Sequence, residues 1–262
     1  MANPQPIYTA ENISVAYQLL WSLSVFWRET MVADDWLDEL RPIAEADGVR
    51  ILEHRLASVF LVSTLPGVIP QQIPRVIKGR LQYLVRGQRP KAFQRNYDLR
   101  SIGSTTREKT EAYVADQLKH HLPDNPTLRA ALAELQVVNP DADLKSPRFA
   151  EHARYWCNLH AVFVHDWRQP ETDPATWLRV RNILRESARL KGWLLSRVGF
   201  VPDHIHLTLG FPPAVPPIKI AESCMNNIAF AHGMRPVLMK SCYLGTIGEY
   251  DVGAIRKENR DE

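Results

Sequence analysis

The segment Val201-Pro202-Asp203-His204-Ile205-His206-Leu207-Thr208-Leu209 alternates two histidines with apolar residues. Successive side chains of a β-strand point to opposite faces, so His204 and His206 share one face, about 7 Å apart along the backbone. Two imidazoles placed side by side can hold one metal ion. An amphipathic strand with two polar histidines is the plainer interpretation. The other face is typical of an antiparallel strand packed on a core, and it comprises Val201, Ile205, Leu207 and Leu209.

The composition is that of an ordinary globular protein. Its 262 residues are 45% hydrophobic and 23% charged, enough for two domains of about 100–150 residues. The net charge of +3 is too small to indicate a nucleic-acid partner by itself. No apolar run reaches the roughly 18–20 residues of a membrane span, and residues 1–8 carry no signal-peptide pattern, so we expect a cytoplasmic protein with no membrane partner. Cys157, Cys224 and Cys242 lack C-x-x-C spacing and are expected to be buried thiols.

The first half predicts the element order βαββαβα. Thr105-Thr106-Arg107-Glu108 fits a capping box that begins the last helix, and Pro42 either kinks the first helix or marks its true start. The expected elements are a strand over Tyr17 to Arg28, a helix over Asp34 to Ala46 ended by Gly48, strands over Val49 to His54 and Ala57 to Leu65, a helix over Pro74 to Arg86, a strand over Tyr97 to Ile102, and a helix over Thr106 to His120.

The same order begins again after a connector, residues 122–154. The connector is rich in Pro, Asp, Asn and Ala, with a short helix around Leu128 to Leu135. The expected elements are a strand over Tyr155 to Arg168, a helix over Pro174 to Lys191 ended by Gly192, a strand over Trp193 to Gly199, the histidine strand, a helix over Ile218 to Ala231, and a strand over Ser241 to Ile247.

Two pairs of segments repeat at one spacing. Ser101-Ile102-Gly103 precedes Thr246-Ile247-Gly248 by 145 residues, and Ser58-Val59-Phe60-Leu61 precedes Asp203-His204-Ile205-His206 by the same 145. We therefore predict an α+β protein made of two tandem βαββαβ domains, residues 1–121 and 155–262, with antiparallel sheets and helices on one face. A chance match between two α+β halves is the alternative.

Each predicted half lacks what the other retains. Val59 and Leu61 stand where the second half has His204 and His206, and neither can bind a metal. Tyr113 and Gln117 lie one helical turn apart on the last helix of the first half. The same spacing places Glu258 and Glu262 opposite them, which predicts that the second half lacks this helix.

The motifs resemble those of the single-tyrosine HUH transposases, which include the insertion-sequence-200/605 type and the REP-associated tyrosine transposases. Pro202-Asp203-His204-Ile205-His206-Leu207 resembles their HUH motif. Tyr97-Asp98-Leu99-Arg100-Ser101-Ile102-Gly103 with Glu111-Ala112-Tyr113-Val114-Ala115-Asp116-Gln117 resembles their last strand and nucleophile helix, and Tyr243-Leu244-Gly245-Thr246-Ile247-Gly248 is similar to the same strand.

The resemblance implies a fold of two ferredoxin-like, HUH-type domains that form a pseudo-dimer. It implies one composite site, in which His204, His206 and Gln117 would ligate Mg²⁺ or Mn²⁺ and Tyr113 would attack DNA to give a 5′-phosphotyrosine. The expected partner is single-stranded or hairpin DNA, in a cytoplasmic, nucleoid-associated setting. The functional unit would be a monomer, with further dimerisation left open.

Structural interpretations stand beside these assignments. Tyr113 also fits a packing tyrosine, Gln117 an exposed helix former, and Asp203 a turn residue that orients a histidine. The other histidines have no partner at ligand spacing and are expected to be surface or satisfied core residues: His54, His120, His121, His152, His160, His165 and His232.

Basic residues concentrate in a run of the first half from Arg75 to Lys109, which holds only Asp98 and Glu108 as acids. Such a run is usually a solvated face, but here it predicts DNA contacts, with Tyr83 and Phe93 as stacking surfaces. The predicted DNA-binding residues are Arg75, Lys78, Arg80, Arg86, Arg89, Lys91 and Arg95.

Two other functions remain open from the sequence. A domesticated, catalytically inactive protein would bind a DNA hairpin without cutting it. A 2H-type phosphoesterase is the weaker alternative, because His206-Leu207-Thr208-Leu209 resembles one H-x-T-x motif and the first half offers no second one.

Overall fold

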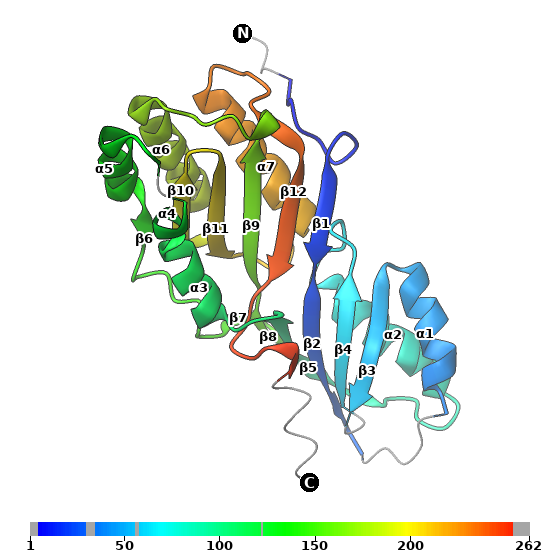
Figure 1. Ribbon diagram of the computed structural model, residues 1–262. Coiled ribbons are helices and arrows are strands. Elements are labelled where there is room, and N and C mark those ends of the chain that lie inside the picture. The colour runs from blue at the N-terminus through cyan, green and yellow to red at the C-terminus, as the bar shows by residue number, and fades with distance from the viewer. Residues whose placement is uncertain (1–4, 30–34, 56–57, 122, 254–262) are drawn as a thin grey trace.

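Two six-stranded sheets lie side by side in the computed structural model (Figure 1), which describes residues 5–29, 35–55, 58–121 and 123–253. The first half contains β1 (Ser14–Gln18), β2 (Leu20–Trp27), α1 (Leu37–Ala46), β3 (Val49–Arg55), β4 (Val59–Thr64), α2 (Gln72–Val85), β5 (Phe93–Ile102), α3 (Arg107–Ala115) and α4 (Gln117–His120). The next segment contains α5 (Pro126–Leu135), β6 (Val137–Val138), β7 (Arg148–Ala150) and β8 (Ala153–Trp156). The second half contains β9 (Asn158–His165), the 3₁₀ turn η1 (Asp166–Arg168), α6 (Pro174–Leu190), β10 (Leu194–Val201), β11 (His204–Gly210), α7 (Pro217–Ala231) and β12 (Leu238–Thr246).

The predicted α+β class and element order are confirmed, with local corrections. Pro42 lies inside α1, and Asp116 separates α3 from α4. The side chain that caps α3 is that of Thr106, which accepts from the amide of Lys109. The predicted capping box is therefore wrong, because the cap is not Thr105 and Lys109 holds the third helical position. Gly48 and Gly192 follow α1 and α6 with φ of 77° and 66°, as expected of glycines that end helices.

The four central strands of both sheets have the same order. The first sheet runs β3-β4-β2-β5 and the second runs β10-β11-β9-β12. All three strand pairings in each set are antiparallel. In the first half α1 connects β2 to β3 and α2 connects β4 to β5; in the second half α6 connects β9 to β10 and α7 connects β11 to β12. This is the βαββαβ order expected from the sequence, present in both halves.

The connector is more than a linker, because its strands complete both sheets. β6 pairs with β10 at the edge of the second sheet, and β7 and β8 extend the first sheet beyond β5. β8 runs parallel to β5, and β1 runs parallel to β12. The expectation of purely antiparallel sheets is therefore wrong at these two contacts.

The two parallel contacts exchange strands reciprocally between the halves. β1 precedes β2 but joins the second sheet, whereas β8 precedes β9 but joins the first. Val15 lies opposite Cys242, and Ala153 lies opposite Tyr97. The two pairings are equivalent in register. Adding 138 to a residue number of β1 gives its counterpart on β8, and subtracting 145 from a residue number of β12 gives its counterpart on β5.

Two buried hydroxyls join the halves where the exchanged strands meet. Ser101 Oγ donates to the carbonyl of Ile247 over 2.6 Å and accepts from the amide of Asn158. Thr246 Oγ1 lies 2.6 Å from the carbonyl of Ile102 and accepts from the amide of Leu20. The two hydroxyl residues are 145 residues apart, as are their carbonyl partners, and the two amide donors are 138 apart. The hydrogen bonds at the junction are therefore related by the same shifts as the strand pairings.

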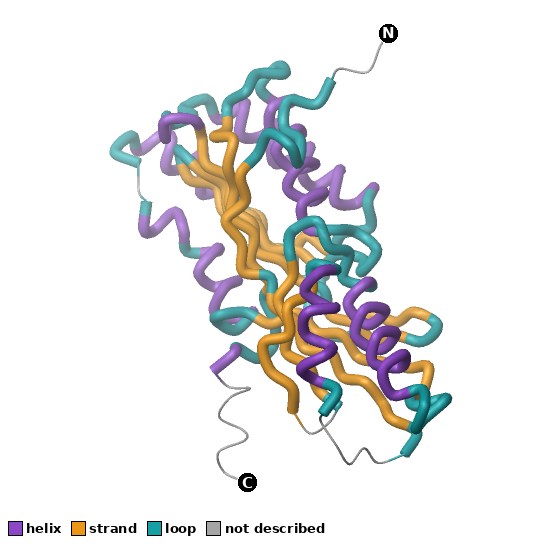
Figure 2. The backbone as a smooth tube through the Cα atoms, turned by 90° about the vertical axis from the view of Figure 1, so that its right-hand side faces the viewer, coloured by secondary structure: helices purple, strands orange, loops and turns teal. Residues whose placement is uncertain are grey.

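Helices cover one face of the first sheet but both faces of the second. α1 and α2 pack on the first sheet, and α6 and α7 pack on the second. α3 crosses from the first half to lie on the opposite face of β10 and β11, and Figure 2 shows helices on both sides of the strand layer there. The expectation of helices on one face is wrong for the second sheet.

The face of each sheet that points away from the α1–α2 or α6–α7 layer is called the front face below. Ile205 and Phe200 point toward α6, where the Phe200 ring contacts Trp177. His204 and His206 point to the front. Val201 lies on β10 opposite His204, so it belongs to the front face and not to the predicted core face.

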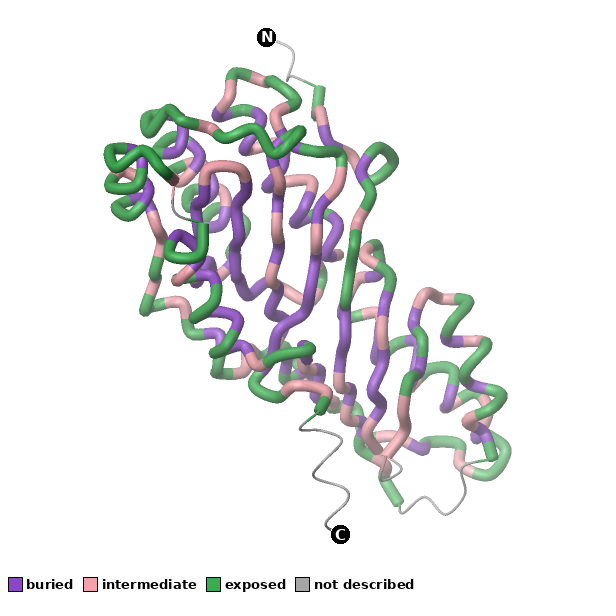
Figure 3. Tube along the Cα trace, in the orientation of Figure 1, coloured by how far each residue is buried: buried purple, intermediate pink, exposed green. Residues whose placement is uncertain are grey.

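α3 on the front face and the α6–α7 layer on the other face together bury β11, which Figure 3 shows as continuous burial along the strand. His204 and His206 are each only 5% exposed. The three cysteines are free and buried, as predicted. No helix within the described residues is long and apolar enough to span a membrane.

Candidate active site

The two histidines of β11 lie beside one another, with ring centroids 4.9 Å apart. His204 Nδ1 donates to Asp203 Oδ1 over 2.6 Å, and Asp203 also pairs with Arg168. His206 Nδ1 shares a hydrogen bond of 3.1 Å with His160 Nε2. Both Nδ1 atoms are thus engaged. When His206 donates this bond, both Nε2 atoms present lone pairs for a further ligand.

Two histidines missed by the sequence analysis complete this cluster. The His160 ring stacks on His206 at 5.3 Å and 14°, and His121 stands edge-on to His204 at 5.1 Å. The expectation that these two histidines have no partner near the histidine pair is therefore wrong, although His121 is exposed and His160 is hydrogen-bonded, as surface and satisfied core residues are. His160 could have been found from the alternation of β9, because it lies opposite Thr208 on the same face as His206.

Burial favours the neutral form of His160, His204 and His206. Desolvation lowers the pKa of His206 to about 2, with further lowering from the neighbouring His160 and His204. Desolvation also lowers the pKa of His160 to about 4. The pKa of His204 falls for the same reason, although hydrogen bonding to Asp203 opposes the fall. Neutral imidazole is the form that binds metal ions.

Tyr113 lies against the histidine pair. Its ring stands edge-on to His206, with centroids 5.6 Å apart and planes at 84°. The residue is 48% exposed, so one side of the phenol faces solvent. The structure therefore brings together a tyrosine of the first half and a histidine of the second, which are 93 residues apart in sequence.

Gly199 on β10 permits this approach of α3. A Cβ at position 199 would lie 2.6 Å from the backbone carbonyl oxygen of Val114, closer than real Cβ contacts. Gly199 also lies opposite His206 in the sheet. The close contact fixes the height of α3 above the histidines.

Buried charge holds the start of α3 on the second sheet. Arg107 pairs with Glu111 one turn later, and Glu111 also accepts from Ser196 Oγ on β10. The Arg107 amide donates to the carbonyl of Gly248 over 2.6 Å. Both side chains of the ion pair are about 10% exposed or less, so this anchoring is largely shielded from solvent.

Gln117 begins α4 just below the tyrosine and is fully buried. Its amide nitrogen donates to the Tyr113 carbonyl over 3.2 Å. Its Oε1 atom has no hydrogen-bond partner among the described residues, although it is buried. A buried carbonyl oxygen without a partner costs about 1–3 kcal/mol, and a cation could satisfy it.

The donor set fits a divalent ion in chemical type. Within the described ranges, no group of three or more His, Cys, Asp or Glu side chains is placed to hold a metal. The predicted set instead combines two histidines with one amide, that of Gln117. Its unpartnered oxygen and the two neutral imidazoles are ligands that Mg²⁺ or Mn²⁺ accepts.

A cavity of about 320 Å³ opens beside Tyr113. Lys109 and Thr110 of α3 line it, together with His160 and Tyr243 on the sheet and the chain after β5, Gly103 to Thr105. It offers a cationic side chain and an aromatic surface next to the phenol.

The predicted basic cluster lies elsewhere, on and after α2, in the helix layer behind the first sheet. Lys78 is corrected to a structural role, since its ammonium donates to the carbonyls of Gln94, Arg95 and Asn96 and burial lowers its pKa. Arg80 pairs with Asp47 and Arg89 with Glu29. The structure does not bring these residues to Tyr113. The predicted Glu258 and Glu262 lie outside the described residues.

Residues 153–231 match the family model described as "Transposase IS200 like". This part of the chain is similar to the IS200-like transposases. The match includes the histidine strand and α6 and α7, and it confirms the resemblance inferred from the motifs. Tyr113 and Gln117 lie outside the matched IS200-like segment.

Solved structures of transposases also show similarity to the chain. A transposase candidate from Deinococcus radiodurans R1 is 20% identical, with a TM-score of 0.32 over 40% of this chain and 88% of that one. A REP-associated tyrosine transposase bound to a REP hairpin is 12% identical, with a TM-score of 0.31 over 39% of this chain and 61% of that one. No curated protein sequence matches the chain.

Proposed function

We propose that this protein is a metal-dependent single-stranded DNA endonuclease and strand transferase with one composite active site per chain. The observation that carries the proposal is the contact of Tyr113 with His206 across the two halves. The similarity of residues 153–231 to the IS200-like transposases supports transposase chemistry. The hairpin bound by the REP-associated neighbour suggests hairpin DNA as one form of the substrate.

His204, His206 and Gln117 would hold a Mg²⁺ or Mn²⁺ ion. When bound, the ion would act as a Lewis acid that neutralises charge on the scissile phosphate. Asp203 orients the imidazole of His204, and His160 that of His206, each by a hydrogen bond to the Nδ1 atom of the proposed ligand. The neutral state of the buried histidines leaves them ready to bind.

Tyr113 would act as the nucleophile. Its oxygen attacks the phosphorus, a new tyrosyl O–P bond forms, and the P–O3′ bond of the DNA breaks. The phenolic proton is lost and the leaving 3′ oxygen gains a proton, so the products are a 5′-phosphotyrosine and a 3′-hydroxyl. The reverse attack by a 3′-hydroxyl on the phosphotyrosine would join strands.

We further infer that the chain is a duplicated, ferredoxin-like pseudo-dimer, with domains at residues 1–121 and 155–262 and the segment 122–154 between them. The equal strand orders and the exchanged registers of β1 and β8 support this origin. With one pair of histidines on β11 and Val59 at the position of His206 on β4, such a chain would nick DNA once. With DNA as its substrate, the protein would be located in the cytoplasm and associated with the nucleoid.

The proposal is tested with 5′-labelled and 3′-labelled single-stranded oligonucleotides and Mn²⁺. We expect a covalent protein–DNA adduct that carries the 3′ label and is absent in Tyr113→Phe, with Tyr17→Phe as the matched control on the exposed strand β1. Retarded DNA without any adduct in the unmodified chain would overturn the proposal and favour the inactive hairpin-binding alternative.

The 2H-type phosphoesterase alternative has less support. It requires a second H-x-T motif beside His206, and the histidine that stacks there, His160, is followed by Ala161 and Val162. A cyclic phosphodiester assay that gave turnover independent of Tyr113 would revive it.

A further inference from the structure

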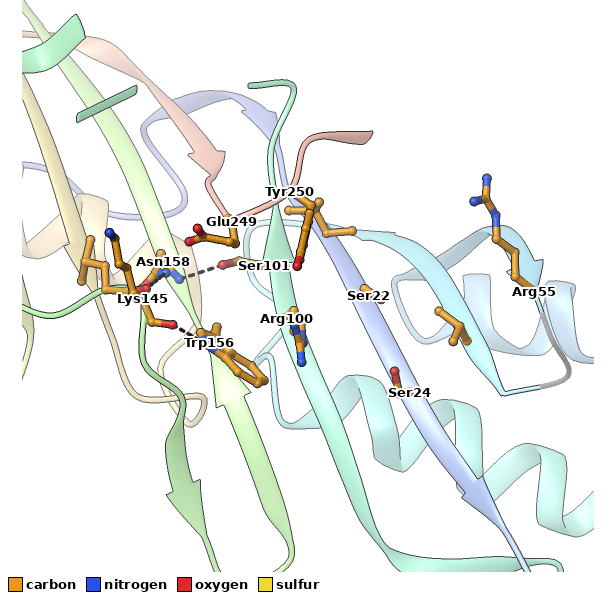
Figure 4. Close-up of a pocket in the computed structure, with 14 residues that line it drawn as sticks. Ser22, Ser24, Arg55, Arg100, Ser101, Lys145, Trp156, Asn158, Glu249 and Tyr250 are labelled. Atoms are coloured by element: carbon orange, nitrogen blue, oxygen red, sulfur yellow. Dashed lines mark hydrogen bonds between the residues drawn. The ribbon is translucent and has the colours of Figure 1, made fainter. Parts of the chain in front are cut away.

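A second cavity, of about 270 Å³, lies on the front face of the first sheet (Figure 4). It opens between β2 and β5 on one side and the chain that follows β12 on the other. The side chains that characterise it are Ser22, Ser24, Arg100, Lys145, Trp156 and Tyr250. None of them contributes to the composite site proposed above.

This cavity occupies the position in the first half that the composite site occupies in the second. The chain after β12, Gly248-Glu249-Tyr250, borders it, and Gly103-Ser104-Thr105 after β5 borders the composite site. These two segments are 145 residues apart. Val59 lies opposite Ser24 as His206 lies opposite the equivalent Val162, so Val59 stands where the second half has His206, and the predicted match of Leu61 to His206 is wrong by two residues. The cavity therefore keeps the architecture of the site without a metal ligand at this position.

Its side chains suit a nucleotide. The Arg100 guanidinium stacks over the Trp156 ring, 4.0 Å from its centroid. The indole Nε1 donates to the Lys145 carbonyl over 2.8 Å, which fixes the ring plane. Among the described residues, neither Arg100 nor the Lys145 ammonium has a carboxylate within ion-pair distance. The cavity therefore combines two cations that have no acidic partner with an aromatic surface.

Its acidic residue is engaged elsewhere. Glu249 lies 3.6 Å from Arg107 at the base of α3. At the rim, Arg55 pairs with Glu53. The serine hydroxyls of β2 add donors at the base of the cavity, where Figure 4 shows them below Tyr250. The balance of charge in the cavity favours an anion.

We propose that this cavity binds one unpaired nucleotide of a single-stranded DNA segment, with its phosphate at Arg100 and Lys145 and its base against Trp156 and Tyr250. The choice of DNA rests on the proposed function. The two cavities adjoin across the junction of the halves, since Ile102 and Gly248 line this one and Gly103 and Ile247 line the composite site. A strand held at Trp156 can therefore continue toward Tyr113.

The test uses the full chain with Tyr113→Phe as background, so that binding is measured without cleavage. A fluorescein-labelled 12-nucleotide single strand is titrated, and binding is followed by anisotropy. Arg100→Gln, Lys145→Gln and Trp156→Leu should each weaken binding about five- to tenfold, and the two charge changes should also reduce the salt dependence. Trp156→Phe, which keeps an aromatic ring, should bind within about twofold of the background.

Matched controls are Arg50→Gln on β3 and Trp167→Leu on η1, both exposed and outside the cavity. Unfolding curves check each variant. If Trp156→Leu does not fold, the exposed Lys145→Gln carries the test. Unchanged affinity in all folded cavity variants would overturn the inference.

Two further measurements distinguish this inference from the proposed cleavage reaction and from the binding of free nucleotides. An unmodified chain that forms no adduct, while the cavity variants still lose affinity, would refute the proposed cleavage and uphold the cavity. A deoxynucleoside monophosphate that displaces the oligonucleotide at micromolar concentration would overturn the assignment to a DNA strand, because it would indicate a site for free nucleotides.

Discussion

Ser22 of the first sheet lies opposite both Leu61 and Arg100, whereas Val162 of the second sheet lies opposite both His206 and Tyr243. Around them the backbone is the same in strand order and in the chain that crosses from the other half. What differs is the chemistry of the side chains: imidazoles in one place, and aliphatic, hydroxyl and guanidinium groups in the other. Equal architecture can therefore support a reaction site and a binding cavity in one chain.

A second difference concerns the helix above the sheet. Gly199 faces His206, and at the matching position Arg55 faces Val59. The glycine admits the backbone of α3 to the histidine face. The arginine has a side chain at that place and pairs with Glu53. The proposed active site therefore requires both the histidine ligands on β11 and a residue without a side chain on β10, which leaves space for the helix that carries Tyr113.

The largest expected effect comes from replacing both histidines of β11 by aliphatic residues. The double change His204→Val and His206→Leu should reduce adduct formation by about 10³-fold or more, because both proposed imidazole ligands are lost. A gel assay with Mn²⁺ measures this, and His152→Val, on an exposed histidine, is the control. Adduct formation at the original rate would break the comparison.

The next effect concerns the height of α3. Gly199→Ala should lower the cleavage rate about 100-fold, since a shift of the order of 1 Å in a reacting group can cost that much. The new Cβ would meet the Val114 carbonyl, which is backbone and has to move. Gly79→Ala on α2, where no atom lies within 4 Å, is the matched control. Equal rates for the two variants would contradict the proposed role of Gly199.

The junction offers a test of the symmetry itself. Ser101→Ala and Thr246→Val each remove a buried hydroxyl that joins the halves, which leaves backbone groups without partners. Each should lower the free energy of unfolding by about 1–3 kcal/mol, by similar amounts in the two variants. Urea denaturation measures the change, and the exposed Ser104→Ala should have little effect. Strongly unequal costs would argue against equivalent roles.

The effect that is smallest per step of the measurement is a gradual dependence of stability on pH. Because burial lowers the folded-state pKa of His160 to about 4 and of His206 to about 2, the unfolded chain takes up their protons first as pH falls below its value near 6.5. Stability should thus be full above pH 6.5 and decrease toward pH 4, on the order of 1 kcal/mol per pH unit for each histidine.

This pH dependence is measured from urea midpoints between pH 7.5 and 4.5 in the presence of a chelator. His160→Gln should show a shallower decrease than the unmodified chain, while His152→Val should show the same decrease. An equal slope in His160→Gln would contradict the assignment of the effect to the buried cluster.

Much of this fold could be predicted from local patterns. The alternation around His204 and His206 predicted a strand with both imidazoles on one side. The spacing of Tyr113 and Gln117 predicted a shared helix, which the structure divides at Asp116 into α3 and α4. The repeat at 145 residues indicated that the halves have the same order of elements. These features depend on periods of two and 3.6 residues, which a sequence displays directly.

The tertiary structure decided which of these patterns meet. Nothing local to Gly199, His160 or Ser196 marks them as supports for a helix that comes from the other half. The exchange of β1 and β8, the burial of the histidine face by α3 and the removal of Lys78 from the basic cluster all depend on pairings between distant segments. Such pairings arise from packing and backbone hydrogen bonds that the whole chain must satisfy together, so the sequence determined the chemical groups and the fold determined their meeting place.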